Sequence, residues 1–259
     1  LDLAGRVVNL LQDGTSSPWP LTGGSAVLRS GAGVVLAPGS HIDVSGGARV
    51  SATGGLSGGA AGSITLSSTA VPSATLLDGS TFSLGGSLQG LALAGARGGS
   101  LSLRAAQVHI GDAATQDDDA GQGILRLAPG FFSQGGFGSF QIDGQQLLAV
   151  QADTLLAPVA SSWVADRALL GAASGSTLAG WARPGGGALA TAPALVGQRQ
   201  PVQLSLQSTG LATSTDGGVL TVGDGARLQL EPQARLTLQA ARQLQMDGQI
   251  QAPAGQVTL

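Results

Sequence analysis

The sequence contains no cysteine and no lysine, and it has few charged or aromatic residues. The absence of cysteine excludes disulfide bonds and thiolate metal sites. Charged residues make up 10% of the 259 residues, and the formal net charge is −3. This balance gives no electrostatic reason to expect binding to nucleic acid or to an anionic membrane. No apolar run reaches about 18 residues, so no membrane-spanning helix is expected. The first residues do not have the pattern of a signal peptide.

Aliphatic residues and glycine dominate instead. Hydrophobic residues make up 42% of the chain, which is enough for a packed core despite 43 glycines. Short runs such as "SITL", "SLSL" and "VQLSL" alternate between aliphatic and polar residues, as strands with one buried face do. Clusters such as "PGS", "DGS" and "GDG" separate these runs and are typical of tight turns.

An internal repeat is the clearest signal. Residues 26–44 align without gaps with residues 220–238, so that aliphatic positions face aliphatic positions and Pro38 faces Pro232. A partial third copy, "ILRLAPG", puts Pro129 in the same place. The two full copies are interpreted as two turns of a repetitive scaffold that have the same cross-section. The prolines are placed at corners, where a missing N–H interrupts no ladder of hydrogen bonds.

Short strands with tight turns fit either a β-sandwich or a solenoid. The unusually short strands, the small aliphatic inward positions and the internal copies favour the solenoid. We therefore predict an all-β parallel β-helix with coils of about 20 to 25 residues. About eight to ten coils would give a length of roughly 40 to 50 Å. Residues 1–144 and 201–259 are assigned to coils of one continuous domain.

Residues 145–200 lose the alternation and are predicted to leave the solenoid and pack along its flank. They contain Trp163 and Trp181, two of the three tryptophans. A short helix from Ser161 or Ser162 to Gly171 and a long ordered loop are both compatible with this segment. The two tryptophans are the candidate recognition surface, because loops on a rigid scaffold often carry binding residues. The alternative is that they only pin the segment to the scaffold.

Three segments carry a resemblance: "GFFSQGGFGSFQIDG" (130–144), "QRQPVQLSL" (198–206) and residues 220–259. They resemble a C-terminal-side region of unknown function in large exoproteins of the filamentous-haemagglutinin family. The phrase "APGSHIDVSGG" is also typical of that family, and the resemblance covers most of the chain. It implies a right-handed parallel β-helix, exported by two-partner secretion through an outer-membrane transporter of a Gram-negative bacterium. It further implies a secreted or cell-surface adhesin that contacts a protein or glycan receptor, or the stalk of a contact-dependent toxin.

Metal binding has only one candidate site. Asp117, Asp118 and Asp119 are consecutive carboxylates beside glycines, and hard oxygen ligands could hold calcium. They lack the spacing and the closing glutamate of an EF-hand, so a solvated loop is the simpler interpretation. "GGFGSFQID" is similar to a calcium-binding nonapeptide, but Phe140 stands where the ligating aspartate belongs. The phenylalanines are instead expected to anchor a corner.

Catalytic residues are not evident. Glycoside hydrolysis needs two carboxylates across a groove, and the one glutamate, Glu231, lies in a predicted corner. His41, Asp43 and Ser45 share a strand face, but residues in line on one strand are too far apart for a hydrogen-bonded relay. We therefore expect a structural shaft of an adhesin, with no catalysis and no cofactor. The alternatives are a polysaccharide lyase or hydrolase, a toxin stalk, and an autotransporter passenger.

Overall fold

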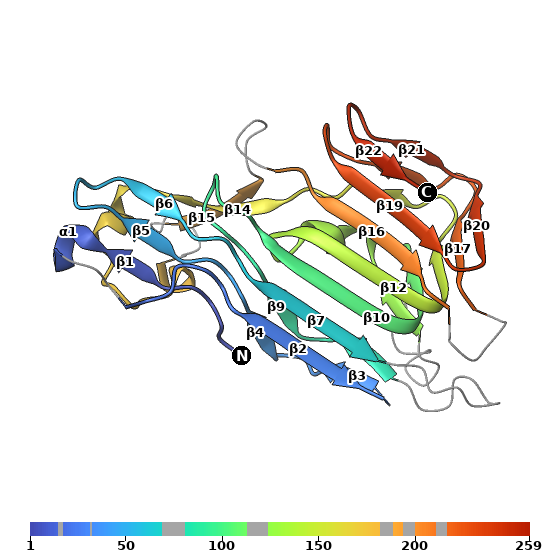
Figure 1. Cartoon of the computed structure of the whole chain (residues 1–259), viewed down its shortest axis with the longest axis horizontal. Helices are drawn as coiled ribbons and strands as arrows, with labels where there is room; N and C mark the ends of the chain where they lie inside the picture. Colours follow the sequence, from blue (N-terminus) through green and yellow to red (C-terminus); the bar gives the residue numbers. More distant parts are fainter. Residues whose placement is uncertain are drawn as a thin grey trace.

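The chain is mostly β, with long parallel sheets (Figure 1). The coordinates are a computed structural model, which describes residues 1–14, 18–31, 33–68, 81–112, 124–181, 189–193, 200–210 and 217–259. Within these ranges, no helix has the length and apolar character needed to cross a membrane. The prediction of an all-β fold is confirmed.

The largest sheet is built on a series of parallel strands that we call row 1. Each strand of row 1 pairs in parallel with the next, and β10 and β12 contribute their first halves. In spatial order the members are β2 (Ser25–Ser30), β7 (Ser63–Ser68), β10 (Gly99–Ile110), β12 (Phe137–Val150), β16 (Gln203–Ser208), β19 (Arg235–Ala240) and β22 (Gln256–Thr258).

Two further series of parallel strands follow row 1 along the chain. Row 2 contains β3 (Gly33–Leu36), β8 (Thr81–Leu84), β11 (Ile124–Leu127), the second halves of β10 and β12, β17 (Val219–Val222) and β20 (Gln243–Met246). Row 3 contains the pair β4 (His41–Asp43) and β9 (Ser87–Gln89) and the series β13 (Leu155–Leu156), β18 (Arg227–Gln229) and β21 (Gln249–Gln251). Apart from the circuit from β10 through β11 to β12, which has no strand in row 3 among the described residues, the chain visits rows 1, 2 and 3 in that order before it returns to row 1.

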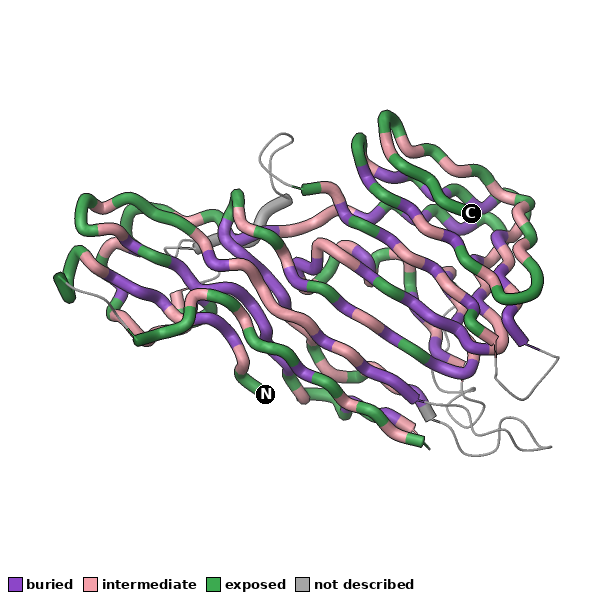
Figure 2. Tube along the Cα trace, in the orientation of Figure 1, coloured by how far each residue is buried: buried purple, intermediate pink, exposed green. Residues whose placement is uncertain are grey.

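The core consists of aliphatic ladders that run across the strands. Period-two alternation turns every second side chain inward, and parallel pairing in register stacks these side chains on those of the next strand. Buried and more exposed residues accordingly alternate along the strands of row 1 (Figure 2). One ladder in row 1 contains Leu66, Leu103, Ile142, Leu206 and Leu238, all of them fully buried.

Successive strands of row 1 are farther apart in the sequence than predicted. Ser25 pairs with Ser63, and Ser63 pairs with Ser100, so the predicted spacing of 20 to 25 residues is wrong there. Only the last return, from Arg235 to Gln256, is that short. Because row 1 has seven strands among the described residues, it spans about 29 Å at the usual strand spacing, which is less than predicted.

The two copies of the repeated phrase lie at different places in the fold, contrary to the prediction. Residues 34–44 run from row 2 to row 3, whereas residues 228–238 run from row 3 to row 1. The copies therefore do not occupy the same cross-section. They share a strand–turn–strand corner, in which proline is followed by a residue of positive φ, Gly39 at 83° and Gln233 at 66°. A backbone hydrogen bond closes each turn, and proline followed by positive φ is the pattern of a type II turn.

A second, smaller body of structure, which we call the flanking lobe, lies at one end of the strands (Figure 1, left). Its elements are β1 (Val7–Asn9), α1 (Leu10–Asp13), β5 (Ala48–Val50), β6 (Leu56–Gly58), β14 (Ser161–Ala165), β15 (Leu189–Pro193) and two 3₁₀ turns, η2 (Arg167–Gly171) and η3 (Leu178–Trp181). It has its own core cluster, which includes Val7, Ala48, Leu91, Trp163 and Leu169.

Residues 145–200, which were predicted to leave the solenoid, differ from that prediction in two ways. Residues 145–156 belong to the parallel rows, because β12 continues to Val150 and β13 pairs with β18. The proposed helix start is wrong, since Ser161–Ala165 is a strand that pairs antiparallel with β15. Within the stretch predicted to be helical, only the 3₁₀ turn η2 is helical, and its cap is Asp166, whose carboxylate accepts a 2.6 Å hydrogen bond from the Ala168 N–H. Strand pairing thus overrides the local preference for a helix.

Candidate functional site

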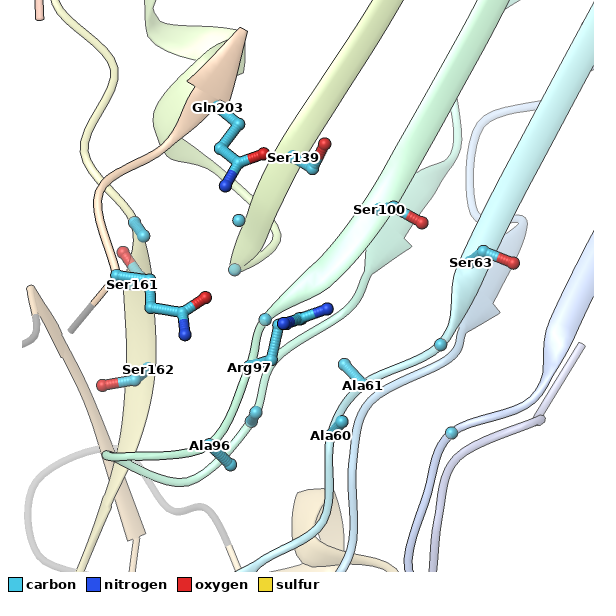
Figure 3. Close-up of a pocket in the computed structure, with 18 of the residues that line it drawn as sticks. Ala60, Ala61, Ser63, Ala96, Arg97, Ser100, Ser139, Ser161, Ser162 and Gln203 are labelled. Carbon is cyan, nitrogen blue, oxygen red and sulfur yellow. The ribbon is translucent and has the colours of Figure 1, made fainter. Parts of the chain in front are cut away.

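A groove of about 940 Å³ lies where the first residues of the row 1 strands meet the flanking lobe (Figure 3). Small residues from several successive circuits line it, so its floor is largely backbone. We call it the serine groove. Its lining includes Gly24, Ser25, Ala60, Ala61, Gly62, Ser63, Ala96, Arg97, Gly98, Ser100, Gly138, Ser139, Ser161, Gln200 and Gln203.

Four serines form a ladder along the serine groove. Ser25, Ser63, Ser100 and Ser139 are paired in register on adjacent strands. Their side chains point away from the core because the next residue on each strand points inward. The hydroxyls of Ser25 and Ser63 are 2.9 Å apart and share a hydrogen bond. The result is a row of hydroxyl groups that repeats at about the strand spacing of 4.8 Å.

Glycine is required in the floor because backbones touch there. A Cβ atom at Gly62 would lie 1.7 Å from the carbonyl oxygen of Gly24, and one at Gly23 would lie 1.9 Å from that of Val44. The Gly62 N–H in turn donates a 2.7 Å hydrogen bond to the Val44 carbonyl. Any side chain at these positions would push neighbouring circuits apart.

The chemistry of the serine groove is that of binding by hydroxyl, amide and guanidinium groups. Arg97 is the one charged residue among the described residues that line it, and no carboxylate of that set faces it. The pair of carboxylates that glycoside hydrolysis needs is therefore not assembled in this lining. A search of the described residues also finds no group of three or more potential metal ligands.

The two predicted tryptophans belong to the flanking lobe, one in its core and one against it. Trp163 is 6% exposed and packs with Leu91, Leu93 and Leu169, and its backbone N–H donates to the Ala92 carbonyl over 2.8 Å. Trp181 is partly buried against the same cluster. Trp163 therefore forms no open surface and holds the lobe against the connection that leaves β9.

The other predicted positions are dispersed. Asp117, Asp118 and Asp119 lie outside the described residues. Glu231 lies in the tight turn before β19 and does not line the serine groove. Phe140 is 1% exposed, and its ring packs edge-on against Phe132 and Phe137 at centroid distances of 5.2 and 5.9 Å. Phe140 thus belongs to the core and not to a metal loop.

The residues His41, Asp43 and Ser45 are not one relay. Ser45 turns away, because its N–H donates to Asp43 Oδ1 over 2.8 Å and its hydroxyl accepts from the Leu91 N–H over 3.1 Å. The His41 ring instead contacts Ser87 on the paired strand β9, with 2.7 Å between Nδ1 and Oγ. Sequence reasoning missed Ser87 because its approach depends on the register between β4 and β9.

Comparisons of the chain with protein-family models, with curated proteins and with solved structures found no match. The family resemblance of the sequence thus remains an expectation.

Proposed function

We propose that this chain is a structural shaft segment of a secreted or surface-exposed bacterial adhesin of the filamentous-haemagglutinin type, folded as a right-handed parallel β-helix. The observation that carries the proposal is the repeated return of the chain to row 1 with parallel, in-register pairing. Each circuit then buries its aliphatic face on the next one, so length can be added without a new core. A stack of this kind is a stiff spacer that grows by about 4.8 Å per circuit.

Adhesion would use the serine groove. Its hydroxyl ladder, its exposed backbone and Arg97 suit the polar surface of a glycan or protein receptor. The groove lies on circuits fixed by the core, so its binding groups are held in place before any receptor arrives. Trp163 and Trp181 are not proposed to take part, because Trp163 is buried in the flanking lobe and Trp181 packs against the same cluster.

The alternative of a polysaccharide hydrolase is less well supported. That chemistry needs two carboxylates about 5 to 9.5 Å apart, and the described lining of the serine groove contains none. A toxin stalk would have the same mechanical role as an adhesin shaft and would differ in what it carries. Export through a two-partner transporter fits a chain without cysteine, because its folding outside the cell needs no disulfide.

Duplication of one circuit tests the shaft. Residues 235–255 make one circuit, since Arg235 pairs with Gln256 in row 1. A second copy inserted after Gly255 is expected to fold and to lengthen the molecule by about 4.8 Å. Solution X-ray scattering measures the length, and limited proteolysis checks that the insert is folded. An insert with the same residues in scrambled order is the control. A duplicate as protease-sensitive as the scrambled insert would contradict the proposal.

A matched pair of bulky substitutions tests the adhesive surface. Ser100 lines the serine groove, whereas Gln239 is an exposed, outward residue on the same row away from it. We expect Ser100→Trp to abolish binding of the chain to target cells and Gln239→Trp to leave it unchanged. Equal binding by both variants would remove the groove from the proposed function.

A further inference from the structure

Ser87, His41 and Asp43 lie together on the outer face of row 3. The Ser87 hydroxyl and His41 Nδ1 are 2.7 Å apart, and His41 Nε2 lies 3.9 Å from Asp43 Oδ2. The imidazole ring therefore stands between a hydroxyl and a carboxylate. This is the order of groups that activates a serine nucleophile, and such contacts are often longer without substrate than with it.

Strand pairing fixes the three residues. His41 of β4 pairs with Ser87 of β9, so both side chains leave the sheet at the same level. Asp43 is two residues further along β4 and therefore shares the face of His41. Its backbone N–H donates to the Leu1 carbonyl, and its own carbonyl accepts from the Leu3 N–H, so a further stretch of chain covers its other side.

Burial differs among the three residues in the way that catalysis requires. The Asp43 side chain is 7% exposed and is held by the Ser45 N–H, which accounts for one carboxylate oxygen and leaves the other directed toward the ring. The His41 side chain is 42% exposed, and Ser87 is exposed. A fixed carboxylate thus orients a ring that a substrate can reach.

Ser87 also lines a cavity of about 570 Å³ that opens beside β9. The cavity lies between β8 and β9 on one side and β11 and η1 (Pro129–Ser133) on the other. Most of its large side chains are apolar: Phe82, Leu84, Leu88, Leu101, Phe131 and Phe137. Its volume is in the range of small-molecule sites, and its walls suit an acyl chain.

Ser40 adds a donor next to the nucleophile. Its Oγ is buried and has no hydrogen-bond partner in the described structure. A Cβ atom at Gly86, the residue before Ser87, would lie 2.1 Å from this oxygen. The hydroxyl therefore lies against the segment that carries the nucleophile.

We propose that this cluster hydrolyses carboxylic esters that have an apolar acyl chain, an activity that goes beyond the shaft role. Ser87 Oγ attacks the ester carbonyl while His41 takes its proton. His41 then gives this proton to the leaving alcohol as the C–O bond breaks, which leaves the acyl group on Ser87. Water attacks the acyl group, His41 takes a proton from the water and returns it to Ser87, and the carboxylic acid leaves. Asp43 is a positioning residue that acts through His41.

A fluorophosphonate probe and p-nitrophenyl esters test the proposal on the purified chain. We expect the probe to modify Ser87, as located by peptide mass mapping, and ester hydrolysis to be faster for the hexanoate than for the acetate. Ser87→Ala removes both labelling and hydrolysis. His41→Ala lowers kcat by about 10²-fold or more, the usual contribution of a general base. Asp43→Asn lowers kcat without changing KM, which a purely structural role would not do.

Ser57→Ala is the control, because Ser57 is an exposed serine of β6 and does not line this cavity. It is expected to retain labelling and hydrolysis. Thermal unfolding of each variant shows whether it is folded, and for a destabilised variant Ser87→Cys replaces Ser87→Ala. No labelling of the folded wild-type chain, labelling at another residue, or unchanged hydrolysis in folded Ser87→Ala would overturn the proposal. A faster acetate than hexanoate would overturn the role of the cavity.

Discussion

Replacing Leu206 by alanine tests the idea that stacked aliphatic ladders hold the rows together. Leu206 is in β16 and is fully buried. It pairs with Ile142 of β12 on one side and Leu238 of β19 on the other, and both of these are also fully buried. Truncation therefore opens a void in the middle of a ladder. Backbone pairing on both sides prevents the neighbouring strands from closing it.

The expected cost can be estimated from buried leucines elsewhere. Leucine-to-alanine changes in cores destabilise by about 2 to 5 kcal/mol, and the cost rises with the volume that stays empty. Because the ladder cannot collapse, we expect about 3 kcal/mol or more in the free energy of unfolding. For a chain of this size, that corresponds to a fall in Tm of roughly 6 to 12 °C.

Urea unfolding followed by circular dichroism measures this free energy. An unchanged slope against denaturant would show that the two states are comparable to those of the wild type. Val27→Ala is the control, because Val27 is in β2 of the same row but is 54% exposed; it should cost less than about 0.5 kcal/mol. A Leu206→Ala loss below about 1 kcal/mol, or an equal loss in both variants, would refute the reasoning.

Three other substitutions test separate contacts by the same unfolding assay. Gly62→Ala should prevent folding or cost several times more than Gly171→Ala, because only the former brings a Cβ atom against a backbone carbonyl oxygen. Asp143→Ala should cost about 1 to 3 kcal/mol, because the buried Asp143 carboxylate accepts hydrogen bonds from Arg104 Nε and from the Thr209 N–H. Asn9→Ala should cost about 1 to 3 kcal/mol and loosen the flanking lobe, seen as a red-shifted tryptophan emission, because its buried amide donates two bonds to η2 and the residue after it. Losses within 0.5 kcal/mol of zero would contradict each of these.

Local alternation was enough to predict the strands and their inward faces. In the aligned segments, Ile42, Val44, Leu236 and Leu238 are all 3% exposed or less, as their period-two positions require. This property depends on neighbouring residues only, because the pleat itself turns successive side chains to opposite faces. The proline-containing turns were predictable for the same reason.

The length of each circuit and the flanking lobe were not predictable from local pattern. Glycine-rich clusters are typical of tight turns, but at Gly62 and Gly23 the chain crosses other backbone at contact distance. Nothing in a run of small residues says which distant carbonyl it will meet. The antiparallel pair of β14 and β15 likewise arises from residues far apart, so a helix seemed equally acceptable there.

The candidate catalytic cluster shows the same limit more sharply. The sequence placed His41 and Asp43 on one face because they share a strand. Ser87, in contrast, lies 46 residues from His41 and approaches it only through the register of β4 and β9. The wrong placement of the repeated phrase has the same cause. A strand–turn–strand pattern specifies a corner but not the row in which the corner falls. Register is set by the lengths of the connections between corners. In a stacked fold, a site formed by side chains of two circuits therefore depends on the lengths of the connections, and no single sequence motif specifies it.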